Sequence, residues 1–301
     1  MVNSALWRER VTPFFTDPAS ADVLSAYRIG TACMGLLVVA IIAPSLLDIY
    51  GAEGFIQWVV SNELFRIASL PSLVQLSELL ERIGVSPDAV VLGAFVVYVL
   101  SLTGMLVGWR TRLTTGIAWM FHFLIANTSI AFGYGVETFL HIGLFYCLVM
   151  PSAERWSLDA RAGRTGHSRV SAGARIAQRV LQIHLCIVYL NSGIAKALGL
   201  EWWNGEAIWR ALMQPDFRQY DLSWLSSFPV ITLLMGWGVL LVEFGYPIAM
   251  YHRRLRPYWL AAIIAVHVSI ALFMGLWMFS LMMIITNLVG FASDSGTLDF
   301  T

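Results

Sequence analysis

One lysine stands out among the residues that could do chemistry. The chain has 19 lysine and arginine residues, and Lys196 is the single lysine among them. It lies in the apolar stretch VLQIHLCIVYLNSGIAKALGLEWW. Arginine keeps its charge at any accessible pH, whereas a desolvated lysine amine can become neutral and act as a base. Two interpretations follow: a buried base, or a lysine that extends from a helix end to the lipid headgroups.

Further ionisable residues interrupt the apolar runs, where charge is costly and therefore marks a functional candidate. They are Arg28, His122, Glu137, His141, His184, Glu243 and His267, with the polar Asn127 and Asn191 in similar positions. Glu137 and His141 are four residues apart and share one helix face; the alternative is a helix N-terminus that enters from a short turn. The histidines also suit hydrogen bonds between helices. Glu243 suits a buried partner for an arginine or a histidine, and Arg28 suits a side chain that reaches the inner surface.

Composition indicates the elements that must position these residues. Hydrophobic residues make up 58% of the chain and charged residues 13%, with a mean hydropathy of +0.70. These values indicate a polytopic helical membrane protein. The formal net charge of zero gives no reason to expect a nucleic-acid partner. Cys33, Cys147 and Cys186 lie in apolar runs without CxxC spacing, so we expect neither a disulfide framework nor a metal site.

The apolar runs predict an all-α transmembrane bundle of about eight spans. The candidates are roughly 24–47, 88–108, 112–131, 137–151, 174–197, 229–251, 257–275 and 277–293. Residues 51–86 mix apolar and acidic positions, which predicts short interfacial helices. Residues 198–228 are rich in tryptophan, which is typical of the headgroup level. We therefore expect a cytoplasmic segment at 1–20, a membrane domain at 21–293 and a cytoplasmic tail at 294–301.

Arginine placement predicts the orientation. With the N-terminus inside, the inner loops hold Arg8, Arg10, Arg110, Arg112, Arg155, Arg161, Arg164, Arg169, Arg253, Arg254 and Arg256. The outer loops hold fewer: Arg66, Arg82, Arg210 and Arg218. The positive-inside rule then predicts a multi-pass protein of the cell membrane with both termini cytoplasmic. Lys196 falls at the outer end of the fifth span.

Five segments carry a family resemblance when taken in order. They are GWRTRL (108–113), RWSLD (155–159), LNSGIAKALGLEWWNGEA (190–207), Glu243 followed by RRLR, and HVSIALFMGLWMFSLMM (267–283). Together they resemble the membrane domain shared by vitamin K-dependent gamma-carboxylase and its bacterial relatives, the HTTM domain. The resemblance spans about residues 20–292.

The resemblance implies a role for Lys196 and His267. In the carboxylase the matching lysine is the base that deprotonates reduced vitamin K, and the oxygenated cofactor then drives carboxylation of a glutamate side chain. His267 matches a family histidine, which we expect to hydrogen-bond the quinone oxygen. Glu137 departs from the family pattern, which has another histidine there. A carboxylase-like enzyme of the lyase or monooxygenase type, using a reduced quinone of the vitamin K or menaquinol type, is thus implied.

The expected site combines the implied catalytic pair with nearby polar and aromatic residues. Lys196 and His267 are the catalytic candidates; the substrate- or cofactor-binding candidates are Glu137, His141, Asn191, Trp202, Trp203, Asn204 and Glu243. The carboxylase carries a large lumenal portion after its membrane domain, and this chain ends at Thr301. The expected substrate is therefore small or peptidic, or is presented by a partner subunit. Membrane lipids are expected partners as well.

Two other functions stay open at this point. One is a non-catalytic membrane module, such as a quinone or lipid binder or a maturation or immunity partner, in which the polar residues serve packing alone. The other is a haem-bearing electron carrier, because His122 and His184 lie at similar depth on different spans and could form a bis-histidine pair.

Overall fold

The computed structural model describes residues 12–64, 70–129, 133–166 and 170–292. In these ranges the chain is α-helical apart from short turns, two 3₁₀ segments and one antiparallel strand pair, β1 (Ala19–Ser20) with β2 (Val170–Ser171). The all-α prediction is confirmed. The expected N-terminal segment 1–20 lies partly outside the described residues, and the expected tail 294–301 lies wholly outside them.

The chain divides into two compact units, and each is described by itself. We call Leu24–Arg169 the N-terminal unit, and Met1–Val23 with Val170–Thr301 the C-terminal unit. Lys196, His267 and Glu243 belong to the C-terminal unit, whereas Glu137 and His141 belong to the N-terminal unit.

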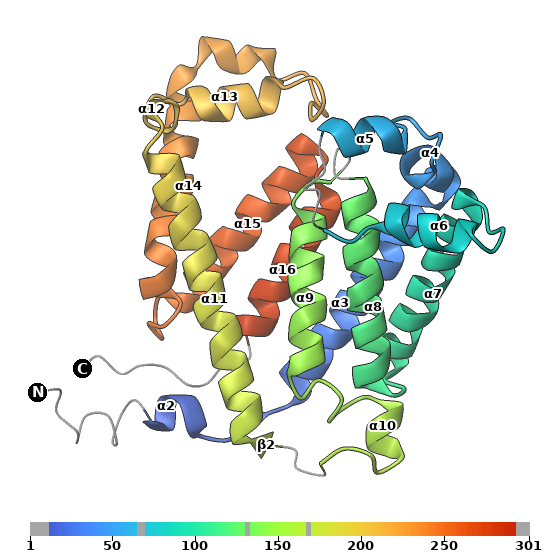
Figure 1. Ribbon diagram of the computed structural model, residues 1–301. Coiled ribbons are helices and arrows are strands. Elements are labelled where there is room, and N and C mark those ends of the chain that lie inside the picture. Colours follow the sequence, from blue (N-terminus) through green and yellow to red (C-terminus); the bar gives the residue numbers. More distant parts are fainter. Residues whose placement is uncertain (1–11, 65–69, 130–132, 167–169, 293–301) are drawn as a thin grey trace, which may run out of the picture. The chain divides into compact units, whose positions relative to one another are not determined.

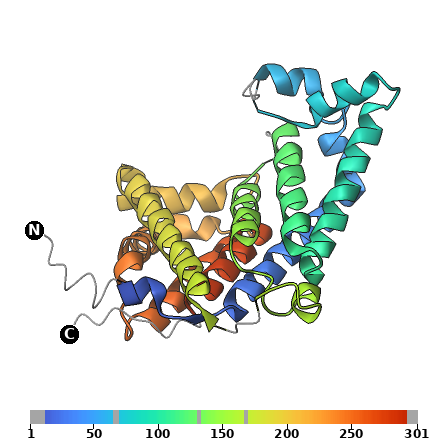
Figure 2. The same ribbon diagram turned by 60° about the horizontal axis from the view of Figure 1, so that its bottom comes forward.

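The N-terminal unit is a set of helices built around α7 and α8. Its elements are α3 (Asp22–Ile42, which begins in the other unit), η2 (Ala43–Ser45), α4 (Leu46–Tyr50), α5 (Trp58–Leu64), α6 (Leu73–Glu81), α7 (Pro87–Val107), α8 (Thr111–Thr128), α9 (Val136–Val149) and α10 (Leu158–Arg161). Helix α8 packs between α7 and α9, and α7 and α8 run side by side in both views (Figures 1 and 2). The short α10 lies beside their ends.

The C-terminal unit is built around α11. Its elements are α2 (Thr12–Thr16), the two strands, α11 (Ala172–Ala197), α12 (Leu200–Trp203), α13 (Glu206–Met213), η4 (Ser223–Ser227), α14 (Pro229–Ala249), α15 (Arg256–Met274) and α16 (Trp277–Phe291). Helix α11 packs against α14 and α16, and α15 packs against both of these. In Figure 1 the short α13 lies crosswise beyond the C-terminal end of α11.

Five helical segments are long and apolar enough to cross a membrane. They are Asp22–Tyr50, Pro87–Val107, Ala172–Ala197, Pro229–Ala249 and Arg256–Met274. Val136–Val149 and Trp277–Phe291 are apolar but shorter. The remaining expected span coincides with α8, which opens TRLTTG and so is less apolar. Each expected span therefore corresponds to a helix, while the count of eight spans stays a prediction.

Serine residues define where several of these helices begin. Ser86 precedes Pro87 and accepts a hydrogen bond from the amide of Ala89 at 3.4 Å, and Ser171 accepts one from the amide of Ala174 at 3.0 Å. Both side chains satisfy amides that have no partner in the first helical turn. Proline at the first position of α7 fits the same turn because its missing N–H is not needed there.

A buried polar stripe fixes the N-terminal half of α11. Arg179 is 2% exposed; it donates to the carbonyl of Phe14 at 3.0 Å and to Oε1 of Gln182 at 2.6 Å. Gln182 in turn donates to the carbonyl of Gly290 on α16 at 2.6 Å. A buried polar group without a hydrogen-bond partner costs free energy, and these contacts give the side chains of Arg179 and Gln182 their partners. They hold α2 and α16 against α11 and so fix the helix that carries Lys196.

Candidate functional site

Lys196 forms an ion pair with Glu243 across two helices of the C-terminal unit. Lys196 lies in the last turn of α11 and Glu243 lies in α14. The amine Nζ is 2.7 Å from Oε1 and 2.9 Å from Oε2 of the carboxylate, and it also donates to Oγ of Ser192. The sequence interpretation of Glu243 as a partner for arginine or histidine was wrong, because the lysine one helix away occupies its carboxylate.

The pair is partly shielded from the surroundings. The side chain of Lys196 is 24% exposed and that of Glu243 is 8% exposed. Gly193 makes the close approach of the helices possible, because a Cβ there would lie 3.3 Å from Cβ of Glu243. Lys196 therefore turns to a partner inside the unit, and the alternative of a lysine extended to the headgroups does not describe it.

The hydrogen bonds of Lys196 suit an ammonium group. A lysine ammonium has three N–H donors. Here two point to the carboxylate oxygens and one to Ser192. Each of the three donors of an ammonium group thus has an acceptor here. The neutral amine that the family resemblance implies for the working base stays a prediction.

A second polar group lies along the same helices, around His267. Oη of Tyr189 is 2.8 Å from Nε2 of His267, and Nδ2 of Asn287 donates to the same hydroxyl at 2.8 Å. Oη of Tyr246 donates to Oδ1 of Asn287 at 2.6 Å. Tyr189 belongs to α11 and Tyr246 to α14, so the His267 group shares these two helices with the Lys196–Glu243 pair.

This hydrogen-bond chain determines the tautomer of His267. Nδ2 of Asn287 also donates to the carbonyl of Met283 at 2.9 Å, which fixes the orientation of the amide because a carbonyl can only accept. The hydroxyl of Tyr189 accepts from Asn287, so its own hydrogen goes to Nε2 of His267. A neutral imidazole with an accepting Nε2 carries its hydrogen on Nδ1. Nδ1 of His267 is buried and has no hydrogen-bond partner in the part of the chain that the structure describes. It is a donor that lacks an acceptor.

Trp202 is the expected aromatic residue that reaches the ion pair. Its ring centroid lies 5.4 Å from Nζ of Lys196, within the range of a cation–π contact. Trp203 instead donates from Nε1 to the carbonyl of Ala197 at 2.8 Å, which fastens α12 to the end of α11. The side chain of Asn191 is exposed. Of these three candidates, the structure brings Trp202 alone to Lys196.

Asn204 and Gly205 shape the turn between α12 and α13. Oδ1 of Asn204 accepts from the amide of Glu206 at 2.9 Å. Gly205 has φ +84°, and a Cβ there would lie 2.6 Å from the amide nitrogen of Leu233 on α14. Glycine is therefore required both by the backbone conformation and by the close approach. Asn204 also lines a pocket of about 410 Å³, whose wall includes Trp209.

Glu137 and His141 lie in the N-terminal unit and do different things. Oε2 of Glu137 accepts from the amide of Tyr134 at 2.8 Å, as a residue at a helix N-terminus does. His141 stacks on Trp119 at 5.1 Å between ring centroids. Nδ1 of His141 is buried without a hydrogen-bond partner among the described residues. Glu137 thus follows the helix-start interpretation, and His141 belongs to an aromatic cluster.

The structure gives His122 two hydrogen bonds. Nδ1 lies 3.0 Å from Oη of Tyr98, and Nε2 lies 3.0 Å from the carbonyl oxygen of Glu137. Both ring nitrogens are engaged, so neither is available to an iron without breaking a contact. The interpretation of His122 and His184 as the two ligands of a haem iron therefore lacks a free ring nitrogen on His122. Within the described ranges, no group of three or more histidine, cysteine, aspartate or glutamate residues is placed to hold a metal ion.

Arg28 joins the end of α7 to the segment that follows α9, a role that the sequence did not reveal. The side chain is fully buried and donates to backbone carbonyls of Met105, Leu106, Ser152, Arg155 and Trp156. Met105 and Leu106 belong to the last turn of α7, where carbonyls are not all used by the helix itself. The expectation that Arg28 reaches the inner surface was wrong, because these carbonyls hold the guanidinium inside.

Asp159 connects the GWRTRL and RWSLD segments. Its carboxylate accepts from the amides of Arg110 at 3.0 Å and Thr111 at 2.7 Å, and from Nε of Arg164 at 2.9 Å. Burial by itself raises the pKa of Asp159, but the hydrogen bonds from Thr111 and Arg164 outweigh it and lower the pKa below its ordinary value. These two family segments therefore build a structural joint at the start of α8.

Helical spacing could have indicated the site residues that the sequence analysis passed over. Tyr189, Ser192 and Lys196 repeat at three and four residues on one face of α11, and Glu243 and Tyr246 do so on α14. The sequence singled out the charged members and passed over the hydroxyl groups beside them.

Comparison with known proteins gives the family. The HTTM domain matches residues 75–294. An uncharacterized protein of Bacillus subtilis (strain 168), YitO, is 25% identical over 208 residues, which cover 65% of this chain and 66% of the relative, just under two thirds of its length. No solved structure matches the chain. The family match covers well over half of the residues and contains Lys196, Glu243 and His267. The chain is therefore a membrane protein of the HTTM domain family, which is related to the carboxylase.

Proposed function

We propose that the protein is a quinol-dependent membrane enzyme in which the Lys196–Glu243 pair takes a proton from the bound quinol. The observation that carries the proposal is the ion pair itself, held by two contacts of 2.7 and 2.9 Å in a largely apolar unit. The resemblance to the carboxylase supports it, because the matching lysine there is the base. A bound reduced quinone would supply the electrons for a reaction with oxygen.

The residues around the pair fit a flat cofactor with polar oxygens. The buried Nδ1–H of His267 lacks an acceptor, and a quinone oxygen would provide one. The ring of Trp202 offers an aromatic face beside Nζ of Lys196. The side chain of Lys196 is 24% exposed and so can be reached without unfolding the unit. Lys196, Trp202 and His267 are the residues that would hold the cofactor.

The pair can act as a base although it rests as an ammonium and a carboxylate. Lys196 gives one proton to Glu243, which leaves a neutral amine beside a carboxylic acid. This neutral amine could then accept a proton from a cofactor hydroxyl and become an ammonium again. The pair would gain one positive charge, which would offset the negative charge that deprotonation leaves. Ser192 accepts a hydrogen bond from the amine and keeps it in place during the transfer.

A quinol-oxidation assay tests this function. The protein in nanodiscs is supplied with reduced menaquinone or reduced vitamin K, and oxidation is followed by ultraviolet absorbance. Lys196→Ala should lower the rate by about 10² to 10⁴-fold, the usual range for loss of a general base. Arg210→Ala is the control, because it removes an exposed ion pair with Glu206 in the same unit. Equal rates for wild type and Lys196→Ala would contradict the proposal.

A second candidate function is a non-catalytic membrane module that binds a quinone or lipid or serves a partner protein. One observation favours it: all three donors of Lys196 are satisfied inside the unit, as a purely structural lock between α11 and α14 would require. In this case wild type would bind quinone or a partner without oxidising quinol. With the enzyme function we further propose that the substrate is a peptide or a small molecule, and that both termini lie on the cytoplasmic side of the cell membrane.

A further inference from the structure

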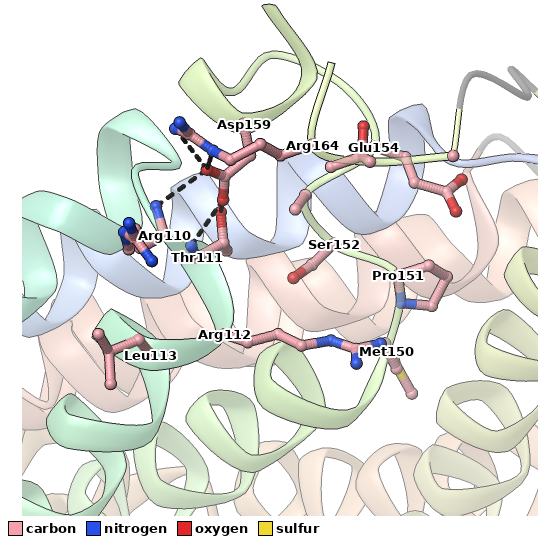
Figure 3. A pocket seen from close by; sticks show the side chains of 13 residues that line it. Arg110, Thr111, Arg112, Leu113, Met150, Pro151, Ser152, Glu154, Asp159 and Arg164 are labelled. Carbon is pink, nitrogen blue, oxygen red and sulfur yellow. Dashed lines mark hydrogen bonds and ion pairs between the residues drawn. The ribbon is translucent and has the colours of Figure 1, made fainter. Parts of the chain in front are cut away.

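A pocket of about 520 Å³ opens in the N-terminal unit, whereas the residues of the proposed function belong to the C-terminal unit. It lies between the start of α8, the segment after α9, and the segment after α10. Its charged lining residues are Arg110, Arg112, Glu154, Asp159 and Arg164. Figure 3 shows Arg112 extended along one side of the pocket toward Met150, with Arg164 and Asp159 on the opposite side.

Two of the three arginines that line this pocket are not paired with its acids. The carboxylate of Asp159 accepts hydrogen bonds from the amides at the start of α8 and forms an ion pair with Arg164 at 2.9 Å. It is therefore already engaged. Among the residues that the structure describes, the guanidinium groups of Arg110 and Arg112 have no hydrogen-bond or ion-pair partner. Two arginines therefore face the pocket with their donors unused.

Arg110 and Arg112 lie where the helix dipole disfavours a cation and favours an anion. Arg110 and Arg112 lie at the N-cap and in the first turn of α8, an 18-residue helix. The N-terminal end of a helix carries a positive partial charge, so a cation there loses about 0.3–1 kcal/mol whereas an anion is stabilised. An anion in the pocket would offset both arginines and the helix dipole together.

Glu154 does not cancel this positive potential. It is the remaining acid of the lining, and burial raises its pKa above the ordinary value. One of its carboxylate oxygens is buried without a hydrogen-bond partner among the described residues. The lining holds three arginines against two acids, so the arginines outweigh the acids in the pocket by number.

The remaining lining residues identify the ligand class. Leu113, Met150 and Pro151 give the pocket an apolar side where α8 begins and α9 ends. Arginine binds phosphate oxygens through paired N–H donors. We propose that this pocket binds a phosphate group, held mainly by Arg112 with Arg110 and Arg164, as found in an anionic phospholipid headgroup or in free phosphate.

Thermal stability of the purified full chain in detergent, measured with added probes, tests the proposal. The probes are dioleoylphosphatidylglycerol, dioleoylphosphatidylcholine and inorganic phosphate. Wild type should be stabilised by phosphatidylglycerol, and Arg112→Gln should bind it about tenfold more weakly, the loss of one charge-assisted contact. The matched control is Arg253→Gln, because Arg253 is an exposed arginine in the turn after α14. It should behave as wild type.

The probes separate the two sources of phosphate. If phosphatidylglycerol stabilises wild type and millimolar inorganic phosphate neither stabilises nor competes, the ligand is a lipid headgroup. If inorganic phosphate stabilises wild type but not Arg112→Gln, the ligand is a soluble phosphate. Equal stabilisation of wild type and Arg112→Gln by every probe would overturn the proposal, as would an equal loss in Arg253→Gln. Gel filtration checks that Arg112→Gln is folded, since the replaced side chain is exposed.

Discussion

The amine of Lys196 lies 2.7 Å from Oε1 and 2.9 Å from Oε2 of Glu243, so the single lysine of the chain is paired with a carboxylate of the neighbouring helix. The pair joins the last turn of α11 to the middle of α14. It places a group that can release and take up a proton inside a largely apolar unit. Arginine could form the same pair but could not change its protonation state.

The two residues should stabilise the protein as a unit. Lys196→Ala leaves a carboxylate that is 8% exposed without its counter-ion, which is strongly destabilising. Glu243→Ala leaves the ammonium unpaired. The double variant removes both charges and should be more stable than the sum of the single effects predicts, by about 1–3 kcal/mol. Thermal unfolding in detergent of the four proteins measures this coupling.

A surface pair in the same unit provides the comparison. Arg210 and Glu206 form an ion pair four residues apart, with side chains 69% and 45% exposed. Their coupling should be at most about 0.5 kcal/mol. Strict additivity at Lys196 and Glu243 would show that the two side chains do not stabilise each other.

The hydrogen-bond chain predicts that His267 is neutral with its hydrogen on Nδ1. Nitrogen NMR of protein labelled with ¹⁵N-histidine distinguishes the two tautomers, and His267→Gln identifies the signal. Tyr189→Phe removes the hydroxyl that donates to Nε2 at 2.8 Å and should shift the tautomer. His267 with its hydrogen on Nε2 in the wild type would show that the chain runs in the other direction.

The stabilisation that the Asp159 carboxylate provides should be lost in acid. Its pKa is below the ordinary value of 3.8 in the folded protein. A lowered folded pKa contributes stability that is complete above pH 3.8 and is lost as pH falls through the folded value. Asp159→Asn should therefore destabilise the protein at pH 7, by about 1–2 kcal/mol for a helix cap. Its melting temperature should approach that of wild type below pH 3.8. A constant difference at all pH values would contradict this origin.

Gly205 should be intolerant of a side chain. A Cβ would lie 2.6 Å from the amide nitrogen of Leu233, and φ is +84°. Gly205→Ala should destabilise the protein by about 1–3 kcal/mol. Gly238→Ala is the matched control, because a Cβ at Gly238 meets nothing within 4 Å. Alanine is also the better helix former by about 1 kcal/mol. Equal melting temperatures of the two variants would contradict the packing argument.

The sequence predicted the helical class and the importance of Lys196, but not its partner. Hydropathy and helix length depend on local composition, so each expected span could be located within a few residues. The pairing of Lys196 with Glu243 depends on which faces of α11 and α14 meet, and spacing along one chain does not encode that. For the same reason Arg28 was misjudged: its partners are backbone carbonyls far away in the sequence. Motif order indicated the family, while the structure showed that Asn204, Gly205 and Asp159 shape turns and helix starts.

Glu137 and His141 were expected as substrate- or cofactor-binding residues, and their place in one site with Lys196 stays a prediction. The structure gives Glu137 a helix-start contact with Tyr134 at 2.8 Å and gives His141 an aromatic contact with Trp119. Both are local interactions that need no cofactor.

The most direct test of the central claim is quinol oxidation by the Lys196→Arg protein in nanodiscs. Arginine can keep the ion pair with Glu243, and so the fold, but it cannot give up a proton. The account predicts that Lys196→Arg melts near the wild-type temperature and oxidises reduced menaquinone at least about 100-fold more slowly. Oxidation at the wild-type rate by Lys196→Arg would show that Lys196 is not the base.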